Sequence, residues 1–181
     1  MSLTITATAG SASANSFVTE AEVVGYMATR LNASAWTTVT GTTCTEDEKK
    51  ALIEATREIS VLAGRAWIGR RADAVQALAW PRYMAPNPDS PTASYFGGTE
   101  IPQRVKDATC ELAFQFLKAG TSDLAAGDAT IGIRTKTIDV ISTTYLDTVD
   151  RPDGLARFPR VLGYIAPLSQ STGTVFPVVR G

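Results

Sequence analysis

Apolar residues recur at intervals of three and four in three stretches of the chain, and this spacing predicts amphipathic helices. The clearest stretch, residues 45–64, opens with a capping box in which Thr45 and Glu48 bond to each other's backbone N–H. A second capping box predicts a helix over residues 19–31. A third helix should span residues 102–120, because this stretch has proline in its first turn and glycine at its end.

The spacing changes to a period of two between residues 131 and 144, where β-branched residues dominate. This alternation predicts one long strand or a hairpin. The sequence shows no obvious partner strands, and a hairpin alone is marginal in water. We therefore predict that this β extension pairs with another protein. After a dense turn signal, a short last helix is expected before Pro167.

The predicted fold class is mainly α: a small bundle of three to four helices with an extended β-strand or hairpin insertion and flexible terminal arms. Residues 1–18 carry no charge and are rich in small polar residues, so they cannot bury enough apolar surface to order themselves. Residues 84–99 hold three prolines and two glycines, which predicts an exposed loop. The expected segments are an extended N-terminal arm (1–18), a helical core (19–119), a hinge (120–130), the β extension (131–150), a C-terminal helix packing on the core (151–168) and an extended tail (169–181).

The composition is typical of a globular protein, and its balanced charges produce no strong electrostatic field. The 181 residues are 44% hydrophobic and 19% charged, which is enough for a sizeable core. The formal net charge of −1 gives no overall attraction to nucleic acid or to an anionic membrane. No apolar run reaches the ~18 residues of a membrane span. The first residues lack the positive start and apolar core of a signal peptide, so we expect a soluble, intracellularly made protein.

The residue types present exclude several kinds of catalytic site. Histidine is absent, which removes the Ser-His-Asp and Cys-His nucleophile systems and His-based zinc sites. Cys44 and Cys110 are too few for a zinc or iron–sulfur cage, and they lack a CxxC or histidine partner that would activate a thiol. The acidic run 46–48 is explained by the helix dipole. We therefore expect no enzymatic activity, no cofactor and no metal.

Residues 57–82 combine five arginines with two tryptophans and two acidic residues. Proteins that bind single-stranded nucleic acid use this combination, because bases stack on aromatic rings while arginine contacts phosphates. Trp67 and Trp80 would then be the stacking residues. In the alternative interpretation both tryptophans complete the core, and the arginines form ion pairs. The shortness of the patch and the slightly acidic chain favour this second interpretation.

Two motifs, Leu-Ala-Trp-Pro-Arg at 78–82 and Ile-Pro-Gln-Arg-Val-Lys-Asp-Ala at 101–108, are fairly specific in combination. With further segments across residues 15–168, they resemble tailed-phage head–tail adaptor, or connector, proteins, which are often labelled "putative DnaT-like" single-stranded-DNA-binding proteins. The further segments are Asn15–Glu22 with Tyr26, Arg30, Leu31 and Trp36, then Lys50–Arg57, Gly69–Arg71, Cys110–Ala113, Phe158–Val161 and Ala166–Leu168.

The resemblance implies a structural virion protein without catalytic residues. About a dozen copies would form a ring, expected to be dodecameric, between the phage portal protein and a tail-side stopper, tail terminator or tail tube protein. Genomic double-stranded DNA would pass through the lumen without sequence recognition, and no membrane would be involved. The implied location is the neck of the virion, after synthesis in the host bacterial cytoplasm. A chain without a large basic face suits such a channel, because it does not grip phosphates.

Two groups of residues are the predicted intermolecular contacts. In the β extension they are Ile131, Ile133, Ile138, Val140 and Tyr145, whose alternative is a sheet within the chain. In the basic stretch they are Arg70, Arg71 and Arg82 in ion pairs between subunits, whose alternative is solvated surface charge. The alternative function is a single-stranded-DNA-binding replication accessory protein that uses Trp67, Trp80 and the nearby arginines.

Overall fold

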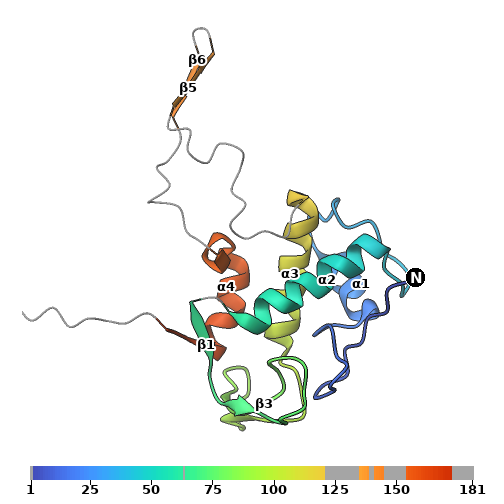
Figure 1. Ribbon diagram of the computed structural model, residues 1–181, viewed down its shortest axis with the longest axis vertical. Helices are drawn as coiled ribbons and strands as arrows, with labels where there is room; N and C mark the ends of the chain where they lie inside the picture. The colour runs from blue at the N-terminus through green and yellow to red at the C-terminus, as the bar shows by residue number, and fades with distance from the viewer. Residues whose placement is uncertain (1, 63, 121–134, 139–140, 145–153, 173–181) are drawn as a thin grey trace, which may run out of the picture.

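The computed structural model describes residues 2–62, 64–120, 135–138, 141–144 and 154–172 (Figure 1). The described α-helices are α1 (Glu20–Thr29), α2 (Glu46–Val61), α3 (Gln103–Ala119) and α4 (Pro159–Ile165). Two 3-10 turns, η2 (Gly154–Arg157) and η3 (Ala166–Leu168), flank α4. The described strands are β1 (Arg65–Trp67), β2 (Arg70–Arg71), β3 (Arg82–Pro86), β4 (Tyr95–Gly97), β5 (Thr135–Ile138), β6 (Ile141–Thr144) and β7 (Ser169–Ser171).

The predicted helices are confirmed, and their apolar stripes form the core. Helix α3 packs against α2 on one side and against α4 on another (Figure 1). Leu52 and Ile59 of α2 and Val105 and Leu112 of α3 are all fully buried in one hydrophobic core. Burying such a side chain contributes ~1.5–3 kcal/mol. Both capping boxes are present, at the first turns of α1 and α2.

A buried carboxylate joins three of these helices. Glu111 of α3 accepts hydrogen bonds from the Tyr26 hydroxyl at 2.8 Å and from the Arg30 Nε and Nη2 at 2.8 and 3.0 Å. Nη1 of Arg160, in α4, lies 3.3 Å from the same carboxylate. Burial alone would raise the pKa of Glu111, but the partners Arg30 and Tyr26 outweigh burial and lower the pKa. This network fixes α1 and α4 against α3.

The expectation of a mainly helical bundle is wrong, because the described residues form a mixed α/β structure. Antiparallel pairing joins β1 to β7, β2 to β3 to β4, and β5 to β6. Residues 64–99, which include the expected exposed loop at 84–99, supply four of these strands. Each of the four has two to five residues. Strands this short do not show an alternating hydrophobic pattern.

The described part of the β extension pairs within the chain. Thr135 of β5 lies opposite Thr144 of β6, and Ile138 lies opposite Ile141. The sheet within the chain, considered as the alternative, is therefore what these eight residues form. The other predicted contacts, Ile131, Ile133, Val140 and Tyr145, lie outside the described residues.

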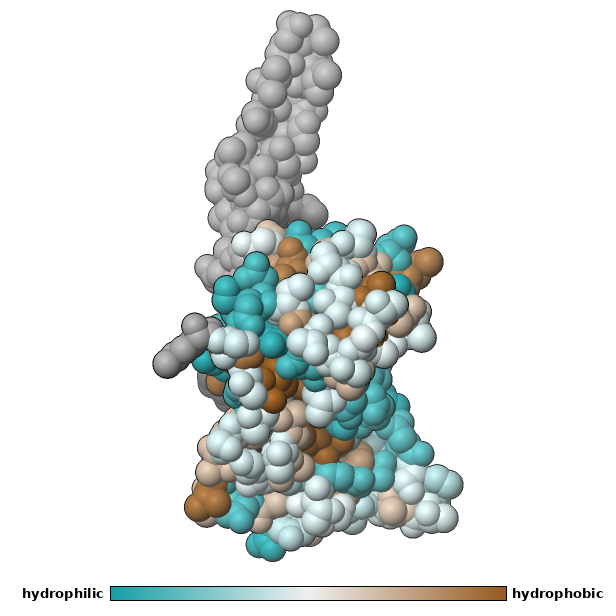
Figure 2. Space-filling view, turned by 90° about the vertical axis from the view of Figure 1, so that its right-hand side faces the viewer, coloured by the Kyte–Doolittle hydropathy of each residue, from teal (hydrophilic) through white to brown (hydrophobic). Residues whose placement is uncertain are grey.

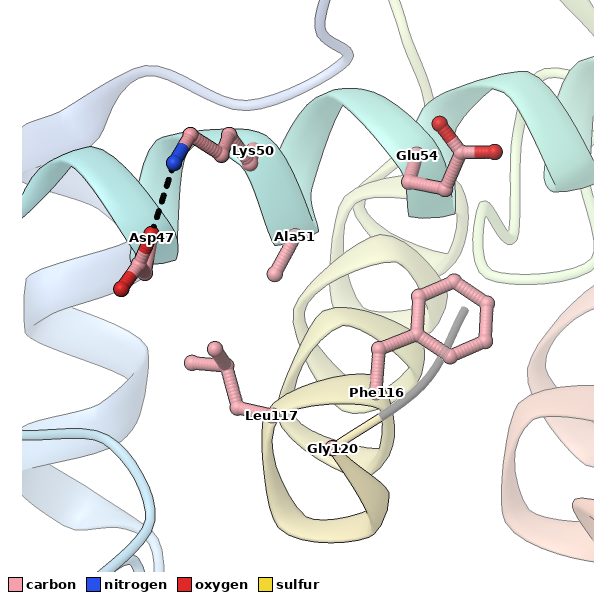
Figure 3. Close-up of a pocket in the computed structure, with 7 residues that line it drawn as sticks. All are labelled: Asp47, Lys50, Ala51, Glu54, Phe116, Leu117 and Gly120. Atoms are coloured by element: carbon pink, nitrogen blue, oxygen red, sulfur yellow. Dashed lines mark hydrogen bonds and ion pairs between the residues drawn. The ribbon is translucent and has the colours of Figure 1, made fainter. Parts of the chain in front are cut away.

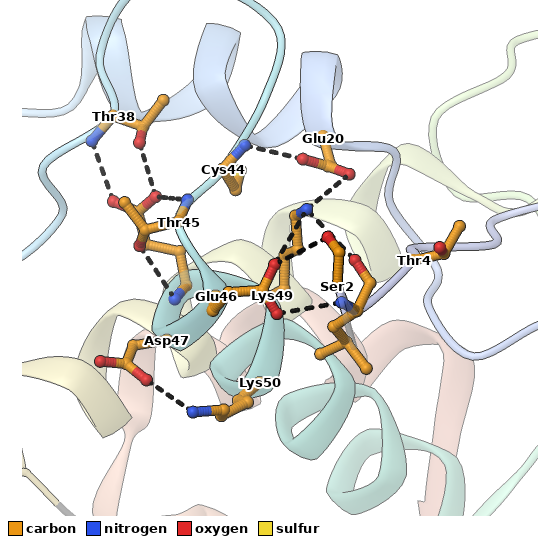
Figure 4. Close-up of polar contacts among 12 residues, drawn as sticks. Ser2, Thr4, Glu20, Thr38, Cys44, Thr45, Glu46, Asp47, Lys49 and Lys50 are labelled. Atoms are coloured by element: carbon orange, nitrogen blue, oxygen red, sulfur yellow. Dashed lines mark hydrogen bonds and ion pairs between the residues drawn. The ribbon is translucent and has the colours of Figure 1, made fainter.

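The segment before α1 packs on the core, whereas we expected an extended arm. Phe17 and Val18 are buried among the core residues. Near the start of the chain, the Leu3 N–H donates to the Glu46 carboxylate at 3.0 Å, and the Lys49 ammonium donates to the Leu3 carbonyl at 3.1 Å (Figure 4). Lys49 also lies 3.7 Å from Glu20. The side chains of α1 and α2 supply charges that the segment itself lacks.

Glu48 holds the loop that leads into α2. Its carboxylate accepts hydrogen bonds from the backbone N–H groups of Thr37, Thr38 and Thr45 at 2.8–2.9 Å, and from the Thr38 hydroxyl at 2.6 Å. Burial of Glu48 would raise the pKa of its carboxyl. The hydrogen bonds from Thr38, Thr45 and Thr37 together outweigh burial and lower the pKa to about 2.

This pKa predicts a pH-dependent stability. Because the folded pKa lies below the ordinary value of 4.5, the stabilisation by Glu48 is complete above that pH and is lost as the pH falls towards 2. The wild type should lose ~3 kcal/mol in free energy of unfolding from this group between pH 6 and pH 2. In urea titrations, Glu48→Gln should be less stable at pH 7 and depend less on pH. The Glu54→Gln variant, which alters an exposed ion pair with Arg57, should keep the wild-type dependence. If the free energy of unfolding fell equally with pH in the wild type and in Glu48→Gln, this explanation would be wrong.

Candidate nucleic-acid interface

The sheet β2–β3–β4 presents aromatic and basic side chains on one outer face. Arg70 lies opposite Tyr83, and Tyr83 lies opposite Gly97. Directly opposed residues of antiparallel strands share a face. The register shifts on β3 between Tyr83 and Pro86, so that Tyr95 lies opposite Pro86, but along β4 Tyr95 is two residues before Gly97 and lies on the same face as Gly97. Tyr83 is 39% exposed and Tyr95 is 58% exposed. In Figure 1, β3 lies in green at the lower end of the protein, away from the upper end of α3.

The two tryptophans lie beneath this sheet. The Trp80 ring packs edge-to-face on Trp67, with ring centroids 5.5 Å apart, and on Phe96 at 5.7 Å. Trp80 is 1% exposed and Trp67 is 9% exposed. The Trp67 indole N–H donates to the Ile59 carbonyl of α2. The structure therefore places both rings in the core, as the alternative interpretation expected, and neither ring is exposed on the outer face of the sheet.

Tyr83 is held by a cation and by two glycines. The guanidinium carbon of Arg70 lies 5.9 Å from the centroid of its ring, within the range of a cation–π contact. Gly98 has a φ of +80°, and a Cβ at this position would lie 2.2 Å from the Tyr83 Cε1. A Cβ on Gly69 would lie 2.3 Å from the Tyr83 carbonyl oxygen. The ring of Tyr83 can occupy its place only because Gly98 has no side chain, and the backbone of β3 can approach Gly69 for the same reason.

The sheet region is locally basic although the whole chain is not. Residues 64–98 contain four arginines and two aspartates, whereas the net charge of the chain is −1. One of the acids, Asp89, is paired with Arg104, which holds the pKa of Asp89 below its usual range. Arg70 and Arg71 are exposed and make no ion pair with any described residue. Their charge is therefore available to an anionic partner.

Arg82 has a different environment. It lies opposite Arg71 in the β2–β3 register, and its guanidinium donates to the carbonyls of Ile68 at 3.0 Å, Ala79 at 3.2 Å and Gly69. Burial and, next, the positive charge of Arg71 lower the pKa of Arg82. No carboxylate of the described chain pairs with either arginine. The expectation that Arg70, Arg71 and Arg82 pair with other subunits stays a prediction.

A groove of about 370 Å³ lies next to this arginine pair. Its walls are mostly apolar, and no acidic residue lines it. The buried hydroxyl oxygen of Ser60, in its wall, has no hydrogen-bond partner in the described part of the chain. The lining residues are Ser60 and Val61 from the end of α2, Ala66 and Trp67 of β1, Arg71, Arg82 and the segment Ala77–Ala79.

Two other hollows are less suited to a polyanion. The groove of about 390 Å³ between α2 and α3 is lined by Asp47, Glu54 and Lys50, so acidic groups outnumber basic ones (Figure 3). At the cleft beside α4, Arg30 and Arg160 are engaged with Glu111. The face turned to the right in Figure 1 shows hydrophobic residues only in small separate areas (Figure 2). The outer face of β2–β3–β4 is therefore the strongest candidate for a nucleic-acid interface.

The two cysteines lie in the core, away from this face. Cys44 and Cys110 are both buried free thiols. Burial, and next the charges of Glu48 and Glu20, raise the pKa of Cys44 to about 12, and burial also raises the pKa of Cys110. Across the described ranges, no three His, Cys, Asp or Glu residues gather as a metal site would require. Nor does any helix there have the length and apolarity needed to cross a membrane.

Comparison with known proteins gives the family. The whole chain, residues 1–181, matches a family described as "Putative DnaT-like ssDNA binding protein", and it belongs to that family. No curated protein and no solved structure matches it. The class of partner that the family indicates is single-stranded DNA.

The identification as a head–tail connector is wrong, because the family match points to single-stranded-DNA binding and nothing in it points to a portal, a stopper or a ring. The physical origin of the error lies in the two motifs that suggested it. Trp80 and Val105, at their centres, are both buried. Motifs of this kind record how a core packs, and proteins with different functions can share a packing arrangement.

Tyr83 and Tyr95 are the functional candidates that sequence reasoning missed. They lie in a stretch rich in proline and glycine, a composition that by itself indicates only a loop. The available signal was the Arg82–Tyr83 pair directly after the buried Leu-Ala-Trp-Pro segment. The sequence does not reveal the register between β3 and β4, which brings Tyr95 to the same face as Tyr83.

The fit of Gly98 against Tyr83 can be tested by adding one carbon. Gly98→Ala should lower the free energy of unfolding by about 1–3 kcal/mol, because alanine is strained at this φ and its Cβ displaces the tyrosine ring. Gly97→Ala is the matched control, since a Cβ there meets nothing within 4 Å. Chemical denaturation of the two variants and the wild type measures the difference. Equal stability of both variants would show that the ring does not depend on Gly98.

Proposed function

We propose that this protein binds single-stranded DNA along the outer face of β2–β3–β4. The observation that carries the proposal is the exposure of Tyr83 and Tyr95 on the same face as Arg70, which has no carboxylate partner among the described residues. Membership of the family supports the class of ligand. The role is one of binding without catalysis, as in a replication accessory protein.

The chemistry of the face suits unpaired bases. Each base of a single strand offers an open π-face, which can stack on a tyrosine ring and contributes ~1–3 kcal/mol. In a duplex these faces are covered by neighbouring base pairs, so the tyrosines cannot reach them. Arg70 lies beside the Tyr83 ring and is placed to contact the phosphate of a stacked nucleotide.

The weak overall charge sets the expected character of binding. A chain with a net charge of −1 has no long-range attraction to DNA, so affinity must come from stacking and from a few arginines. Each phosphate contact on a single strand contributes about −0.7 to the slope of log K against log salt. Binding with a shallow salt dependence is therefore expected.

The proposal predicts a specific loss of affinity when a tyrosine is removed. For a labelled oligothymidylate of about 20 nucleotides, Tyr83→Ala and Tyr95→Ala should each weaken binding roughly 5- to 150-fold, the equivalent of one lost stacking contact. Arg70→Ala should weaken binding and reduce the salt slope by about 0.7. Fluorescence anisotropy at several salt concentrations measures both quantities.

Two controls separate this interface from general effects. Arg57→Ala removes an exposed arginine that pairs with Glu54 on α2, and Leu31→Ala removes an exposed side chain that follows α1. Both should bind the oligonucleotide as the wild type does. If Tyr83→Ala and Tyr95→Ala also bind it with wild-type affinity, the outer face is not the interface.

A further inference from the structure

We propose that the groove beside the sheet is a pocket for one nucleotide, with its phosphate between Arg71 and Arg82 and its base against the apolar wall. This inference rests on the proposed function and extends it to a second surface. Arg71 and Arg82 are opposed in register, one position along from Arg70 and Tyr83, so they belong to the other face of the sheet. Stacking on Tyr83 and insertion into the groove are therefore separate contacts.

The arginine pair is the first reason to expect an anion. Like charges directly opposite each other on neighbouring strands destabilise a sheet. No carboxylate of the described chain pairs with Arg71 or Arg82 to offset their repulsion. The positive charge of Arg71 already contributes to lowering the pKa of Arg82, after burial. An anion between the two guanidinium groups converts this repulsion into attraction. Phosphate matches the planar donor geometry of arginine especially well.

The two arginines differ in how firmly they are placed. Three backbone carbonyls, those of Ile68, Gly69 and Ala79, fix the guanidinium of Arg82. Arg71 is exposed and has no such anchors among the hydrogen bonds of the described residues. Arg82 thus supplies a positioned charge to the lining of the groove, and the exposed Arg71 is free to adjust to a phosphate bound there.

The walls are the second reason, and they favour a nucleotide over a bare phosphate. Besides the two arginines, the groove is lined by Leu78, Ala66 and Trp67, and its surface is mainly apolar. Its volume of about 370 Å³ falls within the ~300–1,000 Å³ of small-molecule pockets. A phosphate next to a flat, mostly apolar group is the chemistry of a nucleotide.

The test uses the full-length protein with three probes: thymidine monophosphate, thymidine and orthophosphate. Isothermal titration calorimetry follows binding. The monophosphate should bind at least tenfold more tightly than thymidine, because thymidine cannot engage the arginines. Arg71→Ala should weaken the binding of both the monophosphate and orthophosphate at least tenfold.

Filling the groove tests the base contact separately. Ala77 lines the groove and is exposed, so Ala77→Leu adds volume there without altering charge or the core. Ala77→Leu should weaken the binding of the monophosphate at least tenfold and leave the affinity for orthophosphate unchanged. Ala28→Leu, an equivalent change at an exposed site on α1, should alter neither. Thermal unfolding of each variant establishes that it is folded.

The outcomes distinguish this inference from the proposed function. Tyr83→Ala should bind the monophosphate normally, because it changes only the outer face. If the monophosphate does not bind, or binds Arg71→Ala and Ala77→Leu as it binds the wild type, the nucleotide pocket is refuted, even if oligothymidylate still depends on Tyr83. The opposite outcome is that the monophosphate binds as expected, while Tyr83→Ala and Tyr95→Ala bind oligothymidylate with wild-type affinity. This result would support the nucleotide pocket and refute the interface on the outer face.

Discussion

The packing of Trp80 ties the helical core to the sheet that carries the proposed binding surface. Its ring lies between Trp67, which is bonded to α2 through the Ile59 carbonyl, and Phe96 on the inner face of β4. Large aromatic side chains contribute heavily to core stability and prefer this edge-to-face arrangement. Without this cluster, strands of two to five residues have little to hold them in place. The position of Tyr83 and Tyr95 on the outside follows from what is buried on the inside.

The arginines of the protein occur in two contrasting environments. Around Glu111, two arginines and a tyrosine converge on one buried carboxylate, and the network is satisfied within the described chain. At the sheet, Arg71 and Arg82 face each other with no carboxylate of the described chain between them. The first arrangement stabilises the contact of three helices. In the second arrangement two positive charges repel each other, and the proposed anion would offset this repulsion. Arginines paired within the chain are therefore structural, whereas unpaired ones are candidates for ligand binding.

The resemblance to head–tail connectors depends largely on residues of the core. The motifs behind it contain Trp80, Val105 and other residues that pack the core. The resemblance also used the exposed Arg70 and Arg71, but it did not use the exposed tyrosines of the outer face. Tyr95, for example, lies in a segment that the resemblance did not use. A family resemblance carried by buried residues therefore informs packing more than it informs partners.

Local sequence determined the helices and their ends. Capping boxes and apolar stripes act within a few residues, so α1, α2 and α3 could be located from them, and the absence of histidine alone constrained the possible chemistry. Tertiary structure alone decided the sheet. Tyr83 and Tyr95 are twelve positions apart, and only the pairing of β3 with β4 brings them to one face. Burial decided the rest: it placed the tryptophans inside and left the tyrosines outside, because which aromatic residue is covered depends on contacts between distant segments that no local pattern records.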